Sequence, residues 1–370
     1  MRPIHVIFLS FALLHWGSAL LPAAERTAWQ AEWERTAAAS LQEGEVTIYG
    51  QARHPTSAAI QAFAQVYPKI RLNFLGGTGN QLGVRVMAEK RAGKHLVDIA
   101  IGGPGTMVEV YYRGGLLEPL AAAFILPEVR DPAFWWDKKH HYADREERYV
   151  FAMTGDVSST IGAYNTRLVK PGEIQSWWDL LQPRWKGKIV ATDPKSSGNI
   201  QNWRYLYYSA DLGPQFIRRL IAEMDLRFSS DERQMMDWVG SGKYPVHLFA
   251  KGANLDRAKG QGLPVEELVS PKEAGSVGTG SGHIAFFKNS PHPNAARLYV
   301  NWILSREGQL AWQKITQDNS LRMDIPKDMV PKEAVVQEGK RYMFMSSPAY
   351  EDIGPLRKLI EESMAAIQRR

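Results

Sequence analysis

The chain has 370 residues, of which 44% are hydrophobic and 23% are charged, and its formal net charge at pH 7 is +6. This length and composition are typical of a soluble folded protein large enough for two ordinary domains, and they argue against a disordered chain or a polytopic membrane protein. The basic residues are spread along the chain, whereas a nucleic-acid-binding protein usually gathers them in one stripe, so we expect no nucleic-acid partner. The modest positive charge favours anionic small molecules as ligands.

The first 24 residues have the pattern of a secretory signal peptide. Arg2 precedes an apolar run over residues 4–21, and small residues follow that run. The alternative, a single membrane anchor, is less favoured because His15 and Gly17 interrupt a run that is short for a membrane span. The absence of cysteine excludes thiolate chemistry and a lipid-modified cysteine after cleavage. We therefore expect residues 1–24 to be removed and the mature protein to be a free monomer in the periplasm.

Three strand-like runs in the first part of the chain are each followed by a loop rich in glycine or polar residues. They occupy residues 46–50, 70–75 and 97–101, with helices expected at 27–41, 56–66 and 81–92. Alternating strands and helices indicate a mainly parallel sheet that is covered on both faces. Since ligands bind outside the carboxyl ends of such strands, the three loops should lie along one edge and line one cleft.

The second part of the chain centres on a short amphipathic helix at residues 176–181 and a buried strand at 189–192. The strand ends in a polar loop that opens onto a new helix, and the loop residues are Ser196, Ser197, Gly198 and Asn199. Free N–H groups and hydroxyls at the positive end of a helix can hold a carboxylate or a phosphate, although many such loops are only helix caps. A further strand at 245–249 ends next to Lys251.

The region after residue 275 should lead back to the first sheet. We expect a flexible linker at residues 275–282, a strand at 283–288, a helix at 293–304 and a mostly helical C-terminal third.

The polar residues at these strand ends favour an anionic ligand. Arg53 can hold a carboxylate or phosphate with two hydrogen bonds, and Lys251 would add a charge from the second lobe. Gly77, Thr78 and Gly79 present N–H groups at a helix start, as the serine loop does. Each residue also has an interpretation without a ligand. Arg53 and Lys251 would be solvated cations in loops, and Gly103 would be part of a plain turn.

Three segments together resemble a known family. Trp177-Trp178-Asp179-Leu180-Leu181, followed by Trp185-Lys186-Gly187-Lys188, is similar to the second-lobe signature of type 2 periplasmic solute-binding proteins of ABC importers. The resemblance is to their iron(III)/thiamine/phosphonate-like branch, extracellular solute-binding protein family 1. The first strand at 46–49 and the segment from Asn294 to Gln309 also resemble that family, so the resemblance spans roughly residues 45–309.

The resemblance implies an α/β, bilobal periplasmic-binding-protein type 2 fold with two mixed sheets flanked by helices and joined by a hinge. It implies residues 27–157 plus 280–370 in lobe 1 and residues 158–279 in lobe 2. Such a protein captures a solute between its lobes and delivers it to an ABC permease in the inner membrane, without a cofactor and without catalysis.

A ferric or ferric-chelate ligand is the alternative within this family. Iron-binding members use a histidine in the first loop, which His54 could supply, and an acidic residue in the third loop, where this chain has Gly103. They also use two adjacent tyrosines after the 245–249 strand, where this chain has Lys251. A lysine there would repel a bare cation, so we assign no metal-binding residue.

Two alternatives lie outside transport. An exported metal-dependent hydrolase would need a metal or nucleophile motif, and His140-His141 with Glu146-Glu147 is the nearest cluster. A periplasmic sensor protein would use the same lobe closure and cannot be separated from a transport receptor by sequence.

Overall fold

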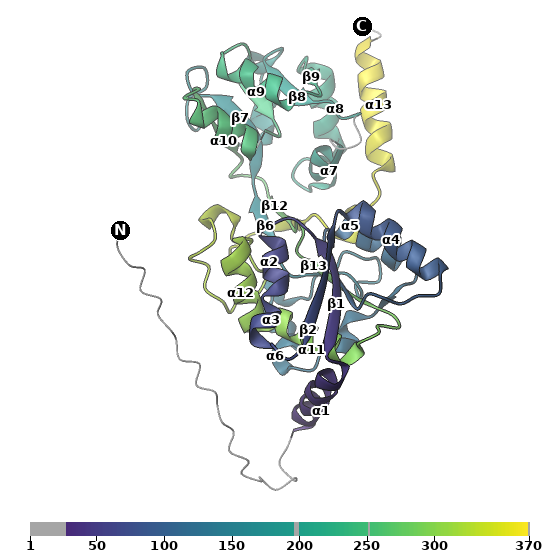
Figure 1. Cartoon of the computed structure of the whole chain (residues 1–370). Coiled ribbons are helices and arrows are strands. Elements are labelled where there is room, and N and C mark those ends of the chain that lie inside the picture. Colours follow the sequence, from purple (N-terminus) through teal and green to yellow (C-terminus); the bar gives the residue numbers. More distant parts are fainter. Residues whose placement is uncertain (1–26, 196–199, 251, 369–370) are drawn as a thin grey trace.

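The computed structural model describes residues 27–195, 200–250 and 252–368. Two large sheets organise the chain, and a small sheet lies between them (Figure 1). We call the elements packed around the six-stranded sheet the first lobe and those packed around the five-stranded sheet the second lobe. The predicted α/β class with two mixed sheets is confirmed.

The sheet of the first lobe has the strand order β2-β1-β3-β13-β4, with β5 paired to β13. Its strands are β1 Glu45–Gln51, β2 Arg71–Gly77, β3 Ile99–Gly102, β4 Leu117–Glu118, β5 Phe151–Ala152 and β13 His283–Phe287. Strand β1 pairs in parallel with β2 and β3, and β13 runs antiparallel to β3, β4 and β5. The sheet is therefore mixed, because the chain returns from the second lobe as an antiparallel strand.

Helices cover both faces of this sheet, and the apolar residues that alternate along β1 and β3 enter two separate cores. The helical elements are α1 Ala28–Glu43, α2 Thr56–Gln61, α3 Phe63–Val66, α4 Gly79–Arg91, α5 Pro104–Thr106, the π-helix η1 Met107–Tyr112, η2 Leu120–Ala123, α6 Pro127–Arg130, η3 Pro132–Phe134, η4 Trp136–Lys138, α11 Pro293–Leu304, α12 Arg306–Thr316 and η7 Lys332–Ala334. Helix α1 ends at Gly44 in the left-handed region (φ 73°), as its glycine predicts. The single helix expected at residues 56–66 is instead interrupted at Ala62.

The sheet of the second lobe has the order β11-β7-β10-β8-β9. Its strands are β7 Thr160–Asn165, β8 Ile189–Thr192, β9 Arg227–Ser229, β10 Val246–Leu248 and β11 Val265–Val269. The helical elements around it are η5 Trp177–Leu181, η6 Pro183–Trp185, α7 Ile200–Tyr208, α8 Gly213–Glu223, α9 Glu232–Gly240 and α10 Ala253–Gly260. Trp177 and Trp185, two tryptophans of the family signature, are buried in the core of this lobe, so their role in the signature is to pack that core.

The C-terminal helix α13, Gly354–Gln368, packs on the second lobe (Figure 1). Its residues Leu356, Leu359 and Ile360 are buried in the same core as Trp177. The lobe boundaries at 157/158 and 279/280, with residues 280–370 assigned to lobe 1, stay a prediction. The contacts of this helix with α7 and α8 place its apolar face against the second lobe.

A three-stranded sheet of β6 Asp156–Ser158, β12 Gly275–Gly278 and β14 Tyr342–Phe344 lies between the lobes. The flexible linker expected at residues 275–282 is therefore wrong over its first half, because Gly275–Gly278 pairs with strands on both sides. The mostly helical C-terminal third is also wrong between α12 and α13, where β14 and the short helices η7 and η8 Pro348–Tyr350 stand in irregular chain.

Residues 1–24, the predicted signal peptide, lie outside the described residues. Within the described part of the chain, no helix combines the length and the apolar character that a membrane span requires.

Candidate functional site

The three loops expected at one edge of the first sheet do lie together. Strands β1, β2 and β3 are parallel, and Gln51 pairs with Gly77 while Gly50 pairs with Ile101. Their carboxyl ends are therefore neighbours, which is where ligands bind in open α/β sheets. Arg53 and His54 follow β1 and are both exposed to solvent. Whether these residues contact a ligand stays a prediction.

The glycine loop after β2 has a structural role of its own. The hydroxyl of Thr78 caps α4 by accepting a 3.4 Å hydrogen bond from the Gln81 N–H. A Cβ at Gly79 would lie 2.5 Å from Oγ1 of Thr106, so glycine permits the close approach of α4 and α5. Gly103 precedes α5 at the end of β3, with an extended backbone.

The predicted second-lobe contacts Ser196, Ser197, Gly198, Asn199 and Lys251 lie outside the described residues. The described chain on either side has the predicted order, because β8 ends at Thr192 and α7 begins at Ile200.

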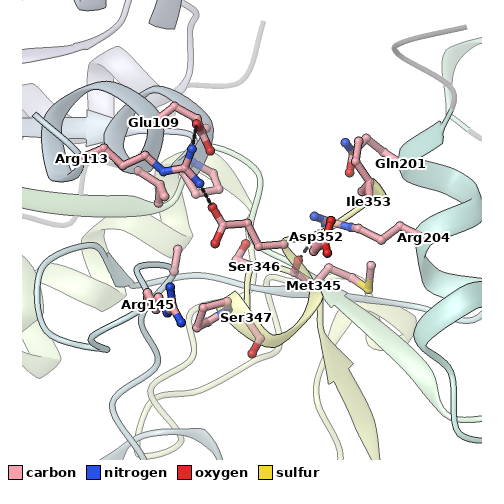
Figure 2. Close-up of a pocket in the computed structure, with 16 residues that line it drawn as sticks. Glu109, Arg113, Arg145, Gln201, Arg204, Met345, Ser346, Ser347, Asp352 and Ile353 are labelled. Atoms are coloured by element: carbon pink, nitrogen blue, oxygen red, sulfur yellow. Dashed lines mark hydrogen bonds and ion pairs between the residues drawn. The ribbon is translucent and has the colours of Figure 1, made fainter. Parts of the chain in front are cut away.

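A cavity of about 1010 Å³ lies between the lobes (Figure 2). Three parts of the chain form its walls: the α5–η1 region with residues 143 and 145 from the first lobe, helix α7 from the second lobe, and the segment at residues 345–353. The π-helix η1 forms part of this wall, and π-helical turns are rare and frequent at functional sites. The lining residues are Pro104, Gly105, Val108, Glu109, Arg113, Ala143, Arg145, Gln201, Arg204, Met345, Ser346, Ser347, Pro348, Glu351, Asp352 and Ile353.

None of the described predicted site residues lines this cavity. It adjoins them along the chain, because Pro104 follows Gly103 directly and Gln201 follows the serine loop closely. The sequence therefore located the neighbourhood of the cavity but not its charged side chains.

Arg204 is the most informative of those side chains. Its Nη2 donates a 2.9 Å hydrogen bond to the Met345 carbonyl, while its Nε is buried and has no acceptor among the described residues. No carboxylate of the described chain forms an ion pair with it. Burial lowers the pKa of Arg204 below its ordinary value because the charged form loses hydration, yet a guanidinium stays protonated at neutral pH. A half-buried cation that lacks a counter-ion favours an anion beside it.

The opposite wall carries two more arginines, which Figure 2 shows across the cavity from Arg204. Arg113 is neutralised by two carboxylates: its Nη1 lies 2.6 Å from Glu109, and its Nη2 contacts Glu351. Arg145 is exposed and makes no hydrogen bond or ion pair with the rest of the described chain. The cavity thus offers two uncompensated guanidinium groups, one from each lobe.

The sequence held one signal for Arg204. Ile200, Trp203 and Leu206 are buried in α7, so Gln201 and Arg204, three residues apart, share the polar face of that helix. No local pattern marks Arg113, Arg145 or the 345–353 segment as cavity walls, because they meet only in the folded chain.

No group of three or more His, Asp or Glu side chains in the described residues is arranged to hold a metal ion. His140 and His141 are instead surrounded by aromatic rings, including those of Trp136 and Phe151. Burial lowers the pKa values of both histidines.

Comparison with known proteins identifies the fold and the family. A family model described as bacterial extracellular solute-binding protein matches residues 53–310. An uncharacterized protein of Haemophilus influenzae is 26% identical over 291 residues, which cover 74% of this chain and 76% of that protein.

The chain matches solved structures of the same fold over almost the whole length of those structures. The Trichodesmium protein IdiA (FutA), in complex with iron and citrate, has a TM-score of 0.59 and 18% identity, covering 88% of this chain and 99% of its own. Iron-bound HitA from Pseudomonas aeruginosa has a TM-score of 0.54 and 18% identity, with coverages of 86% and 99%. The periplasmic binding protein AfuA from Actinobacillus pleuropneumoniae, with fructose-6-phosphate bound, has a TM-score of 0.50 and 21% identity, with coverages of 88% and 99%.

The bilobal periplasmic-binding-protein fold is therefore confirmed, as is the resemblance to type 2 solute-binding proteins. Two sheets joined by connecting strands, a cavity between their lobes and a family match over residues 53–310 agree with one another. The chain belongs to the bacterial extracellular solute-binding protein family.

Proposed function

We propose that this protein captures a small anionic solute in the cavity between its lobes and delivers it to an ABC permease. Family membership makes the chain a substrate-binding protein of the ABC-transporter type and not an enzyme, with a small ligand, a permease partner and a periplasmic location. The anionic character of the ligand, the monomeric state, the lobe boundaries and the signal peptide at residues 1–24 are our proposals.

The main support for an anionic ligand is the environment of Arg204. A guanidinium on the second lobe lines the cavity without a carboxylate partner, and its buried Nε–H has no acceptor, among the residues that the structure describes. Unpaired buried donors cost free energy until a ligand satisfies them, and a guanidinium suits carboxylate and phosphate because it donates two parallel hydrogen bonds. Arg145 supplies a second unpaired cation from the first lobe.

The other residues of the walls support a ligand that also carries hydroxyl groups. Ser346, Ser347 and Gln201 offer neutral hydrogen-bonding groups beside the arginines. Arg53, His54 and Thr78 follow the neighbouring carboxyl ends of β1 and β2, and we propose that they add to the anion-binding surface there; Lys251, the fourth proposed contact, lies outside the described residues.

A ferric chelate is the second candidate. It is favoured by the likeness to an iron-and-citrate-bound protein, since citrate is an anion of the kind that Arg204 would bind. A bare ferric ion is not favoured, because it needs several anionic oxygen ligands and the described residues contain no such acidic or histidine group.

A thermal-shift screen tests the proposal, because a ligand that binds only the folded state raises the melting temperature. The probes are inorganic phosphate, citrate, ferric citrate and fructose 6-phosphate, with neutral fructose as the control that lacks only the phosphate. We expect at least one anion to raise the melting temperature in a concentration-dependent way. At a hundredfold excess over Kd, the ligand adds about 2.7 kcal/mol to the free energy of unfolding. Stabilisation by fructose and by none of the anions would refute the proposal.

A further inference from the structure

The segment at residues 345–353, which we call the C-terminal strap, crosses the cavity between β14 and α13. It contributes seven of the cavity's lining residues, and no other continuous segment contributes more. Strap residues Met345, Ser346 and Ser347 lie between Arg145 on one side and Arg204 on the other in Figure 2. The strap is thus part of the ligand chamber and not merely a connection to the last helix.

The strap begins on the sheet between the lobes, where the Met345 N–H donates to the Val277 carbonyl at 3.0 Å and Ser346 hydrogen-bonds Thr279, and its later contacts, apart from an ion pair of Glu351, are with the second lobe. Arg204 donates to the Met345 carbonyl at 2.9 Å, and the Tyr208 hydroxyl donates to the Asp352 carbonyl at 2.5 Å. The Tyr208 ring also packs on Tyr350, with 5.2 Å between centroids. At its end the strap enters α13, whose apolar face is buried in the second lobe. It should therefore move with the second lobe when the lobes move.

One ionic contact joins the strap to the helices of the first lobe among the described residues. Arg113, at the end of η1, pairs with Glu351 through Nη2 and with Glu109 through Nη1. Glu109 lies four residues before Arg113 and belongs to the same helix, whereas Glu351 lies 238 residues away on the strap. Of these two pairs, the one with Glu351 joins the first lobe to the strap.

This link places a carboxylate inside a chamber whose walls carry arginines. Glu351 and Arg145 line a common recess beside Arg113. An anionic solute that reaches this recess would compete with Glu351 for Arg113, because either anion can pair with that guanidinium.

We propose that Glu351 is a specificity-determining residue: the solute anion displaces it from Arg113, and this exchange releases the strap from the first lobe. The inference rests on the proposed function, because it requires an anion in the cavity. It goes further by assigning the C-terminal strap to the ligand-binding machinery and by coupling occupancy to lobe movement through one ion pair.

Two matched variants separate the strap from simple charge. Glu351→Gln removes the charge that joins the strap to Arg113, and Glu109→Gln removes an equal charge from the same arginine without touching the strap. In calorimetric titrations with citrate and with fructose 6-phosphate, we expect Glu351→Gln to tighten binding about two- to fivefold, as for a half-exposed ion pair.

A distance measurement reports the mechanical link without a ligand. The chain has no cysteine, so Val84→Cys on α4 and Asp256→Cys on α10 give one spin-label pair across the lobes. The distance distribution of ligand-free Glu351→Gln should be broader than that of the parent and of Glu109→Gln. Addition of the binding anion should also change the parent's distribution, because the exchange breaks the same ion pair before the lobes close on the solute.

The outcomes separate this inference from the proposed function. If an anion binds the parent but Glu351→Gln and Glu109→Gln match each other in affinity and in distance distribution, the strap inference is wrong and the receptor function stands. If none of the anions binds the parent, the proposed function fails and the competition with Glu351 fails with it.

Discussion

Replacing Arg204 should weaken ligand binding far more than it weakens the fold. A guanidinium has five N–H donors, and the fold uses one hydrogen bond of Arg204, to the Met345 carbonyl. Arg204→Ala deletes the donors left for a ligand, and two charge-assisted hydrogen bonds lost at about 1.5 kcal/mol each amount to roughly 3 kcal/mol, or about a hundredfold in Kd. The stability of the ligand-free protein should change by less than about 1 kcal/mol, because a lost hydrogen bond is offset by removal of a poorly hydrated cation.

Isothermal titration with the anion that gives the largest thermal shift, at fixed ionic strength, measures the loss, and urea denaturation without ligand measures stability. Arg204→Lys keeps the charge but not the planar pair of donors, so we expect a loss of about tenfold. Unchanged affinity in Arg204→Ala would refute the assignment. An unfolding free energy lowered by several kcal/mol, with intact affinity in the folded fraction, would show that Arg204 is structural.

Three further predictions concern the fold that positions the cavity. Gly162→Ala should prevent stable folding, because its Cβ would lie 1.9 Å from the His247 carbonyl oxygen, whereas Gly260→Ala, with no atom within 4 Å, should be tolerated; soluble yield and circular dichroism compare them. Asn301→Ala should lower the free energy of unfolding by about 3 kcal/mol in urea titrations, since it leaves the N–H groups of Ile125 and Leu126 and the Ala123 carbonyl unpaired; a loss below about 1 kcal/mol would contradict this accounting. Burial lowers the pKa of His247 to about 4, and neither ring nitrogen has a partner in the described chain. Its neutral form stabilises the fold above pH 6.5, and this contribution is lost between pH 6.5 and about 4, so His247→Leu should flatten the pH dependence of stability there by up to about 1.4 kcal/mol per pH unit.

The strap also gives the C-terminal helix a role in the transport cycle. Because α13 is anchored in the second lobe by Leu356, Leu359 and Ile360, the strap follows that lobe and brings Glu351 toward or away from Arg113. A receptor built in this way reports an occupied cavity through a change between its lobes, which is the signal that a permease partner can recognise.

The order of elements and the kind of fold follow from local features of the sequence. Alternating apolar runs, glycine loops and helical spacing depend on neighbours a few residues apart, and they correctly predict β1, β2, β3 and β8 and the helices α4 and α7. The same is true of the end of α1 at Gly44 and of the buried Trp177 and Trp185, on which the family resemblance depends.

Sequence reasoning was less successful where a segment depends on distant partners. Gly275–Gly278 resembles a linker, yet it forms β12 because it pairs with two distant strands. Strand β6 lies more than 110 residues before it, and β14 lies more than 60 residues after it. The strap has no regular pattern, so nothing local marks it as a cavity wall.

The charged site is decided by tertiary structure alone. Arg204 meets Met345 across 141 residues, and Arg113 meets Glu351 across 238. A sequence shows which residues carry charge, but whether a guanidinium is paired, solvated or left without a counter-ion depends on what the folded chain places beside it. Local pattern therefore predicted alternating strands and helices and carried the motifs whose family resemblance implies a two-lobed solute receptor. Only the packing of the strap against both lobes decided which arginines lack a counter-ion in the described chain.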